Sequence, residues 1–464
     1  MKTTRIMIIV AAAVAAIACN KENIEQTNPA TAPSDGLVTF TAGFDAIGEP
    51  GTRTNLAQNE AGEYTKMVWS AGDVIGVVDK NGKVQPFTTE QGGATAIFKG
   101  AAEAPESTWY AFYPYNEQAK VSSVTDPTLD ISIPEVQFAK KDGVSDNVTT
   151  LVGNCSVEGN SIMFTHVCGF VQINAPEGCV SVTIELPEAN DGITGGVGTK
   201  FYKFTTYSTK IRYRSVTLVS QEGMATGNYY IAVKPIKYTG KVRITMHHKD
   251  GSVFVKEASG LSVGAGEVLP VNITGFSWAA DKEISLFTGA ESDKFSNKND
   301  GYQCKIAKVS DETMVGIKSM SWAFTEEITS EWAGYLDFAG TAVDLTDYQA
   351  DYALEYYIKC NQAAVTTCGM DWELIQHVFN DGKTSKSQCI MSQRNGSDTY
   401  FGLGDTGWHR ISLPIKDVIS TIGGASMNTF SLKPYGSGIK AIQSYKGAEF
   451  YINNLRIVRI TPTE

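Results

Sequence analysis

Residues 161–189 read SIMFTHVCGFVQINAPEGCVSVTIELPEA, and this stretch decides the fold class. It holds two apolar runs, residues 161–173 and 181–189, and the residues between them include the turn formers Asn, Pro and Gly. Val, Ile, Thr and Phe predominate in both runs, which favours strands. The runs are too densely apolar for a strand with one wet face. The stretch therefore predicts two β-strands that are covered on both faces.

Shorter β-like runs continue this pattern toward both ends of the chain. They are LVTFTAGF (37–44), MVWSAGDVIGVVD (67–79), TWYAFYPY (108–115), NYYIAVKP (228–235), KVRITMHH (241–248), YALEYYIKC (352–360), GWHRISLPI (407–415) and EFYINNLRIVRI (449–460). Gly, Pro, Asn or Asp separate the runs, and long helical periodicities are hard to find. The sequence therefore predicts an all-β protein.

The chain divides into several parts by composition. At 464 residues it is too long for one core, and one domain per roughly 150 residues predicts three. The amino-acid composition changes near residue 278, because most of the Trp residues lie after it. We expect a signal peptide, a tether and three β domains, at residues 1–18, 19–36, 37–155, 156–277 and 278–464.

The first residues have the form of an export signal. Lys2 and Arg5 precede one apolar run, residues 6–18, which is shorter than the roughly 20 residues that span a bilayer. Small residues close this run just ahead of Cys19, and the junction resembles a bacterial lipobox. The resemblance implies that Cys19 is acylated and anchors the protein to a membrane. Ordinary secretion with an incidental Cys is the alternative.

The segment after Cys19 is polar, contains two Pro and has no apolar pattern, so it predicts a flexible tether. Lys21 and Glu22 resemble the charged segment that directs some lipoproteins to the outer face of the outer membrane. We therefore expect an outer-membrane location that faces the cell exterior. A net charge of −11 shows no basic surface of the kind that nucleic acids require.

Seven Cys residues remain once Cys19 is set aside, and an odd set cannot pair completely. Their spacing contains no zinc motif, so no metal site is expected. Cys360 and Cys368 flank a turn-like segment and could form a bridge. Buried free thiols are the favoured alternative, because Cys packs as a small apolar residue.

A series of short motifs follows a recognisable order along residues 37–275. They are Gly51-Thr52-Arg53-Thr54, Trp69 with Gly72-Asp73, Ala96-x-Phe98-x-Gly100, Tyr110 to Tyr115, Ile133-Pro134-x-x-Gln137, Phe164-Thr165-His166, Gly227 to Ile231 and Gly264 to Glu267. This series resembles the fimbrillin-like family of surface lipoproteins from gut and oral Gram-negative bacteria. The resemblance implies two transthyretin-like β-sandwich domains and a role in adhesion or as a fimbria-associated subunit.

Two residues of this series carry separate expectations. In the fimbrial members of that family a protease cuts after an early Arg, and Arg53 stands where that Arg would stand. Cleavage would release Cys19 together with the strand at residues 37–44, and other fimbrial subunits would then be partners by strand exchange. The alternative is that Arg53 is an exposed loop residue. His166, among apolar neighbours, is expected to be a buried, hydrogen-bonded histidine rather than a ligand.

The last block has a different likeness. Residues 407–415 and 449–460 resemble the final strands of jelly-roll carbohydrate-binding modules, in which the last strand reads Tyr-Ile-Asp-Asn. The resemblance implies a C-terminal jelly-roll β-sandwich that contacts a glycan or another surface ligand. Here Asn453 replaces the usual Asp, which weakens the case for a structural calcium.

The alternation of two strands in this block predicts which side chains face a ligand. In residues 352–360, Leu354, Tyr356 and Ile358 face the core, so Glu355 and Tyr357 lie on the opposite face. The run DWELIQHVF adds Trp372 and His377. Aromatic, carboxylate and imidazole groups suit sugars, so the ligand candidates are Glu355, Tyr357, Trp372 and His377. Solvated face residues and ordinary core aromatics are the alternative.

Motifs for catalysis are absent from the sequence. It contains no GxSxG, HExxH or phosphate-binding GxxxxGK[ST] run, and the Gly-rich residues 192–198 are expected to form a loop. Adjacent carboxylates at Glu326 and Glu327 would point to opposite faces of a strand. We therefore expect a non-catalytic protein without a cofactor. An adhesion protein and a glycan-binding lipoprotein that captures polysaccharide for a nutrient-uptake system remain as alternatives.

Overall fold

The computed structural model describes most of the chain beyond the N-terminal segment. The described residues are 37–44, 56–58, 64–117, 119–122, 127–145, 148, 151–187, 192–201, 206–271, 276–281, 283–288, 295–297, 304–307, 310–314, 317–326, 334, 336–361, 375–380, 406–434 and 446–462. Strands dominate them, and they contain one α-helix, α2 (Ile415–Ile422), and one 3₁₀ helix, η1 (Thr346–Tyr348). This confirms the predicted all-β fold class.

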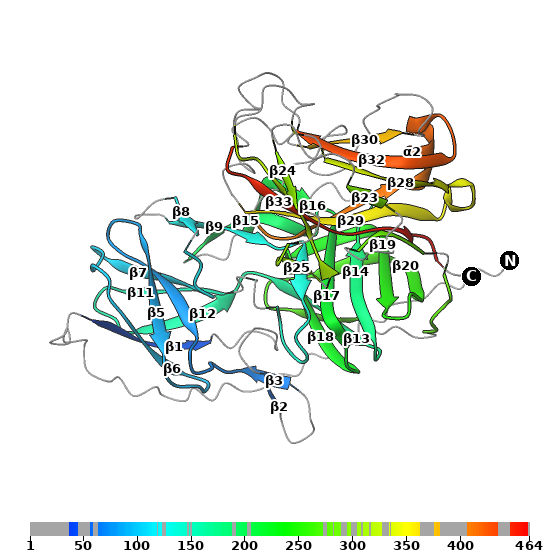
Figure 1. The fold of residues 1–464 in the computed structure, drawn as a ribbon. Helices are drawn as coiled ribbons and strands as arrows, with labels where there is room; N and C mark the ends of the chain where they lie inside the picture. Colours follow the sequence, from blue (N-terminus) through cyan, green and yellow to red (C-terminus); the bar gives the residue numbers. More distant parts are fainter. Residues whose placement is uncertain are drawn as a thin grey trace.

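The first sheet closes into a seven-stranded barrel, which is drawn in blue and cyan in Figure 1. Around the barrel the strands are β1 (Val38–Phe44), β12 (Ser161–His166), β11 (Leu151–Ser156), β7 (Thr108–Tyr113), β4 (Val74–Val78), β5 (Val84–Thr89) and β6 (Ala96–Gly100). A separate hairpin joins β2 (Leu56–Gln58) to β3 (Tyr64–Met67). Because β12 pairs with β1 and β11, the barrel extends beyond residue 155, where we placed the first boundary; the domain division stays a prediction.

The barrel core is built around one indole ring. Trp69 is buried, its Nε1 donates to the Ala42 carbonyl at 2.9 Å, and its ring meets those of Phe98, Tyr113 and Phe164 edge-on. Such edge-to-face pairs stabilise a core beyond the area they bury. Trp69 is therefore a core residue of the barrel, and Phe98 and Tyr110 are buried beside it in the same part of the chain.

The second unit, residues 127–145 and 167–281, packs two sheets around a separate core. One sheet has the order β10 (Val136–Phe138), β17 (Ser215–Met224), β14 (Cys179–Glu185), β19 (Ile236–His248) and β20 (Val253–Val263), and the other has β18 (Gly227–Val233), β13 (Gly169–Ala175) and β21 (Val268–Val271). The apolar run at residues 161–173, which we predicted to be one strand, is divided between β12 of the barrel and β13, and the run at residues 181–189 contributes to β14. Both β13 and β14 are central strands of their sheets. Each therefore has neighbours on both edges as well as cover on its faces.

A smaller sheet has the order β16 (Thr206–Tyr213), β15 (Thr194–Lys200), β9 (Thr128–Ile133) and β8 (Lys120–Val121). The Gly-rich run that we expected to form a loop lies in β15, so that prediction is wrong. The reason is tertiary: β15 pairs along its length with β9, and with β16 across a register shift at Gly195–Val197. Two neighbouring strands thus hold a segment that has weak strand propensity of its own.

The C-terminal unit, residues 283–462, is a second sandwich of two sheets. The larger sheet has the order β24 (Lys305–Ala307), β27 (Met320–Ala323), β33 (Glu449–Arg459), β29 (Tyr352–Cys360) and β31 (His409–Pro414), with β22 (Ile284–Phe287) paired to β33. The smaller sheet has β23 (Phe295–Asn297), β28 (Leu336–Asp344), β32 (Ser426–Pro434) and β30 (Ile375–Asn380), and β25 (Thr313–Met314) pairs with β26 (Ile317–Lys318). Trp322 is fully buried in this core.

The second and C-terminal units pack against each other, as Figure 1 shows with the green strands beneath the yellow-to-red ones. Their contact has its own apolar cluster of Val136 and Val219 from the second unit with Met314, Tyr357 and Trp408 from the C-terminal unit. The contact is thus a buried interface between two sheets.

The connection between these units is held on both sides. The Trp278 ring packs on His248, and Ala279 exchanges two backbone hydrogen bonds of 3.0 Å with Val253. Asp281 then accepts hydrogen bonds from Tyr352 at 2.5 Å and from Arg459 at 3.2 Å, in the C-terminal unit. The chain therefore enters the C-terminal unit in one fixed direction.

No disulfide joins two cysteines of the described residues. Cys168, Cys179, Cys304 and Cys360 are buried and Cys155 is half-buried, which agrees with the favoured alternative of buried thiols. Cys368 lies outside the described residues, so the possible bridge to Cys360 stays a prediction. His166 is half-buried beside the Phe170 ring; its Nδ1 has no hydrogen-bond partner among the described residues, contrary to expectation. Burial lowers the pKa of His166 to about 4.

Candidate functional site

The structure places two of the four ligand candidates in the interior. The alternation predicted for β29 is correct, because Leu354, Tyr356 and Ile358 lie in the C-terminal core. Glu355 and Tyr357 lie on the opposite face, but each is only 1% exposed. The prediction that they contact a ligand is therefore wrong in this conformation. The reason is that the second unit covers the face we expected to meet solvent.

The other two candidates cannot be judged in the same way. Trp372 lies outside the described residues, as do Cys19 and Arg53. His377 lies on β30, where its backbone is in register with Leu432 of β32. Trp372, His377, Cys19 and Arg53 therefore stay predictions.

Glu355 is the centre of a buried charge network that joins the two units. Its Oε2 accepts from Arg410 Nε at 2.6 Å and its Oε1 accepts from Arg456 Nη2 at 2.8 Å. Arg456 also donates to Glu283 at 2.8 Å, and Glu283 lies 3.5 Å from the His247 ring of the second unit. Two short charge-assisted bonds on one carboxylate hold both guanidinium groups in place.

The network changes the acidity of its carboxylates. Burial by itself would raise the pKa of Glu355, but the charges of Arg410 and Arg456 outweigh it and lower the pKa to about 2. Burial by itself would also raise the pKa of Glu283, but Arg456 and His247 outweigh it and lower the pKa to about 2. Both carboxylates are therefore ionised at neutral pH, and each needs its partners to remain so in the interior.

Asn453, which stands where the related modules have Asp, makes hydrogen bonds within the C-terminal unit. Its side chain is buried, and its Nδ2 donates to the Ile317 carbonyl at 2.8 Å and to Ser319 Oγ at 3.0 Å. The amide thus ties β33 to the segment at β26. Within the described residues no group of three or more His, Cys, Asp or Glu side chains lies close enough to bind a metal.

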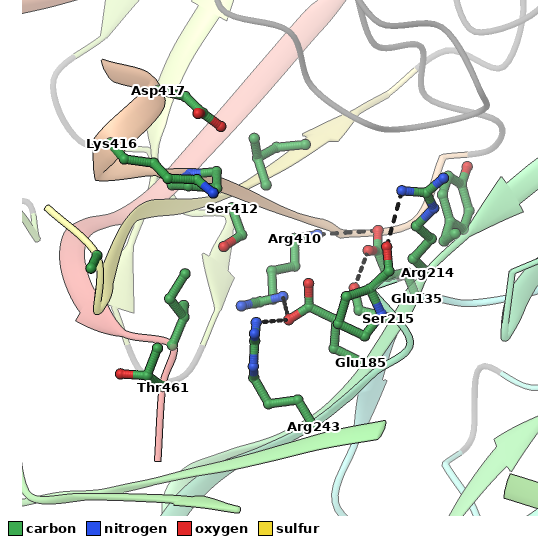
Figure 2. Close-up of a pocket in the computed structure, with 16 residues that line it drawn as sticks. Glu135, Glu185, Arg214, Ser215, Arg243, Arg410, Ser412, Lys416, Asp417 and Thr461 are labelled. Atoms are coloured by element: carbon green, nitrogen blue, oxygen red, sulfur yellow. Dashed lines mark hydrogen bonds and ion pairs between the residues drawn. The ribbon is translucent and has the colours of Figure 1, made fainter. Parts of the chain in front are cut away.

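A pocket of about 330 Å³ opens beside the charge network. The second unit lines it with Glu135, Glu185, Pro187, Tyr213, Arg214, Ser215 and Arg243, and the C-terminal unit lines it with Ala350, Arg410, Ile411, Ser412, Pro414, Lys416, Asp417, Ile460 and Thr461. Figure 2 shows Ser412, Lys416 and Asp417 on one side and Arg243 on the other, with Arg410 and Glu185 between them. The pocket therefore exists only where the two units meet.

Part of the polar lining is committed to contacts within the protein. Glu135 accepts from Ser215 Oγ at 2.7 Å and from the Arg410 backbone N–H at 3.3 Å, and it lies 3.5 Å from the His409 ring. The Oε2 atom of Glu185 lies 3.3 Å from Arg243 Nη1 and 4.0 Å from Arg410 Nη1. These contacts fix the back wall of the pocket.

Other polar groups of the lining are available to a ligand. Lys416, half-buried Ser412 and half-buried Asp417 make no side-chain hydrogen bond or ion pair with any described residue, and Lys416 is exposed. Across the pocket the buried Nε of Arg243 has no hydrogen-bond partner within the described part of the chain. The pocket thus offers an ammonium, a carboxylate and a hydroxyl to one occupant.

Sequence reasoning missed this pocket. Arg410 and Ser412 lie in the run GWHRISLPI, which we used as a fold resemblance rather than as a source of ligands. Lys416 and Asp417 follow directly in α2, where a short helix leaves the strand end. Neither the partner residues of the second unit nor their position could be deduced, because they lie about 200 residues away in sequence.

The described residues contain no helix long and apolar enough to span a membrane. No family model matches this chain, and no curated protein matches it in sequence. The resemblance to fimbrillin-like proteins and the resemblance to a lipobox therefore stay predictions.

Solved structures similar to this chain include carbohydrate-binding modules. The tandem CBM22 domain of Xyn10C from Paenibacillus barcinonensis is 12% identical, with 85% of this chain and 98% of that one covered and a TM-score of 0.24. A carbohydrate-binding module of the β-sandwich superfamily is 10% identical, with 62% of this chain and 99% of that one covered and a TM-score of 0.23. The structure of infectious bursal disease virus strain Gx is 11% identical, with 94% of this chain and 75% of that one covered and a TM-score of 0.15. TM-scores this low give no argument for function.

Proposed function

We propose that this protein is a non-catalytic binding protein of the cell surface that takes a saccharide in the pocket between its second and C-terminal units. The observation that carries the proposal is the set of uncommitted polar side chains, Ser412, Lys416 and Asp417, around one pocket of about 330 Å³. That volume is within the range of small-ligand sites.

The chemistry of a sugar hydroxyl matches these groups. Each hydroxyl donates one hydrogen bond and accepts others, so it is best bound by a donor and an acceptor together. Lys416 supplies donors, Asp417 supplies acceptors and Ser412 supplies both. A carbohydrate therefore fits the lining better than a purely apolar ligand.

The anchor belongs to the same proposal. Acylation of Cys19 would hold the protein on the outer membrane, and the polar tether of residues 20–36 would carry the β units away from the lipid. The protein would then present its pocket to glycans outside the cell, either for adhesion or for capture of polysaccharide.

A binding experiment on the whole chain tests the proposal. We would produce residues 20–464, probe a glycan array, and measure the best hits by titration calorimetry. We expect saturable binding, weakened at least about tenfold by Lys416→Ala. Lys99→Ala is the matched control, because Lys99 is an exposed lysine on β6 of the barrel. Equal loss in both variants, or no saccharide bound at all, would contradict the proposal.

The same samples test whether the protein is catalytic. Each bound saccharide would be incubated with the protein for a day and assayed for new reducing ends. We expect none above the buffer background. Release of reducing ends that Lys416→Ala abolishes would show an enzyme instead.

A second candidate function, subunit assembly in a fimbria, is favoured by the position of β1. This strand lies between β6, to which it runs antiparallel, and β12, to which it runs parallel. Phe40 and Ala42 point from it into the core. Loss of β1 after cleavage at Arg53 would therefore leave a groove with two unpaired edges that a strand of a second subunit could fill.

Cleavage followed by size measurement tests this second candidate. We would treat the protein with an Arg-specific protease and follow its mass by size-exclusion chromatography with light scattering. Assembly by strand exchange predicts oligomers that Arg53→Ala does not form. A cleaved protein that stays monomeric would remove the support for fimbrial assembly and leave saccharide binding untouched.

A further inference from the structure

We infer that the second and C-terminal units form a joint that opens, and that the saccharide binds only while the two units are docked. Binding in the pocket and docking of the units are then one coupled equilibrium. This inference rests on the proposed function and adds the regulation of the same site. It follows from the origin of the pocket walls, from the lengths of the contacts between the units, and from the way the units are connected.

Neither unit contains the pocket by itself. Ser412, Lys416 and Asp417 line it from the C-terminal unit, whereas Glu185 and Arg243 line it from the second unit. Figure 2 shows Lys416 and Arg243 on opposite sides of the pocket. Separation of the units would remove one wall, so an occupant that contacts both walls binds the docked form alone. Such an occupant stabilises docking by mass action.

The back wall of the pocket is itself formed by docking. The backbone N–H of Arg410, in β31 of the C-terminal unit, donates to Glu135 of the second unit at 3.3 Å. The His409 ring lies 3.5 Å from the same carboxylate, and the Arg410 side chain lies 4.0 Å from Glu185. The state of the Arg410 N–H therefore reports whether the two units are docked.

In the charge network, the short contacts lie within the C-terminal unit and a longer one crosses to the second unit. Glu355 accepts from Arg410 at 2.6 Å and from Arg456 at 2.8 Å, and Arg456 donates to Glu283 at 2.8 Å. Across the interface, Glu283 lies 3.5 Å from the His247 ring, whereas charge-assisted hydrogen bonds are about 2.7–2.9 Å long. Parting of the units would therefore leave Glu355 and Glu283 paired, and would not strand a buried charge.

The apolar part of the interface is small. Its cluster consists of Val136 and Val219 from the second unit with Met314, Tyr357 and Trp408 from the C-terminal unit. Domains move relative to each other unless the interface between them is large and hydrophobic. We therefore expect this cluster to keep most of the free protein docked and the open form to be a minor population.

The connection keeps the units attached when the interface opens. Ala279 exchanges backbone hydrogen bonds with Val253 of the second unit, and Asp281 accepts from Tyr352 of the C-terminal unit. Ala280 stands between these two attachments. Hinges consist of a few residues that absorb a change in backbone dihedrals, so rotation at Ala280 is sufficient to turn one unit away from the other.

Two variants open the interface without altering the pocket lining. Met314→Asp puts a carboxylate into the apolar cluster, where Met314 is fully buried, and His247→Ala removes the contact of Glu283 across the interface. Neither residue lines the pocket. Met163→Asp is the matched control, because Met163 is exposed on β12 of the barrel. Lys416→Ala is the contrast, because it changes the pocket and leaves the interface as it is.

Two measurements on the whole chain, residues 20–464, are compared. Hydrogen exchange of the Arg410 N–H gives the docked fraction. Calorimetry gives the affinity for the tightest binder among cellobiose, maltose, xylobiose, lactose and N,N′-diacetylchitobiose. When only docked protein binds, the apparent Kd is the intrinsic Kd divided by the docked fraction.

We expect Met314→Asp and His247→Ala to lose affinity by the factor by which the docked fraction falls, about tenfold for a fall to about one tenth. Lys416→Ala should lose affinity with no change in docking, and Met163→Asp should change neither. The coupling is reciprocal, so the bound saccharide should also slow exchange at Met314, outside the pocket.

The outcomes separate the coupling from the proposed function. An affinity that stays constant while the docked fraction falls would overturn the coupling and leave saccharide binding in place. A docked fraction that stays near one in both variants would show that the units do not part, and would overturn it as well. Because Met314→Asp could disturb folding, His247→Ala carries the test if that variant melts early. No binding of any saccharide, in this panel or on the array, would overturn the proposed function and the coupling together.

Discussion

A single carboxylate, Glu355, holds the charge network together. Glu355→Gln keeps the shape of the side chain but removes the charge that Arg410 and Arg456 face. Loss of one partner from a buried ion pair costs about 3–5 kcal/mol, so we expect a fall of that order in the free energy of unfolding measured with urea. Glu103→Gln is the control, because Glu103 pairs with Lys80 on the surface. An unchanged urea midpoint for Glu355→Gln would contradict this account.

The same residue makes a prediction about pH. The pKa values of Glu355 and Glu283 are lowered to about 2 in the folded protein, below the value of about 4.3 for an unfolded Glu. Their contribution is therefore complete above about pH 5 and is lost as the pH falls toward about 2. We expect the free energy of unfolding to decrease over that interval, and Glu355→Gln to make the decrease smaller. Urea titrations at several pH values would measure both slopes.

Asn453 makes the third prediction at the scale of one residue. Asn453→Asp keeps the size of the side chain but replaces its amide donors with a carboxylate that faces the Ile317 carbonyl. The hydrogen bond to the Ile317 carbonyl is lost and two acceptors face each other there, whereas the Ser319 hydroxyl can turn and donate to the carboxylate. We therefore expect a destabilisation of about 2–4 kcal/mol. The matched control is Asn174→Asp at an exposed position on β13. Full recovery of stability on addition of calcium would instead show that the carboxylate forms a metal site.

At the scale of one element, β1 shows how a short strand closes a barrel. Phe40 is 1% exposed and contacts the rings of Phe87 and Trp109. Phe40→Ala removes these contacts, and we expect a loss of about 3–5 kcal/mol in the stability of the barrel, measured by thermal unfolding. Thr39→Ala changes the neighbouring residue on the other face of β1 and should cost far less. Similar melting temperatures for both variants would show that β1 is not part of the cooperative barrel.

At the scale of the whole molecule, we expect the second and C-terminal units to unfold together. Trp408 lies in the apolar cluster between them and Lys359 lies over its ring at 5.9 Å. We expect calorimetry of the full chain to show one transition for both units, and Trp408→Ala to split it into two. Trp69→Ala, a matched change in the barrel core, should lower only the barrel transition. Two separate transitions in the unchanged protein would contradict the shared interface.

Much of the fold follows from local pattern. The density of Val, Ile, Thr and aromatic residues with Gly, Pro and Asn between runs predicts the all-β class, and alternation in β29 assigns Leu354, Tyr356 and Ile358 to the core. Each of these depends on spacing along one strand, which the sequence contains in full.

The sequence by itself therefore determined the class of fold, the inward faces of its strands and the polar segment that precedes them. Tertiary structure alone decided the rest: that β15 is a strand, that the second unit covers Glu355 and Tyr357, and that Arg243 and Lys416 face one pocket. Alternation states only that two side chains share a face, and it does not state whether water or another sheet covers that face. The cover comes from residues about 100–200 positions away, so it is set by packing between units and not by any local propensity.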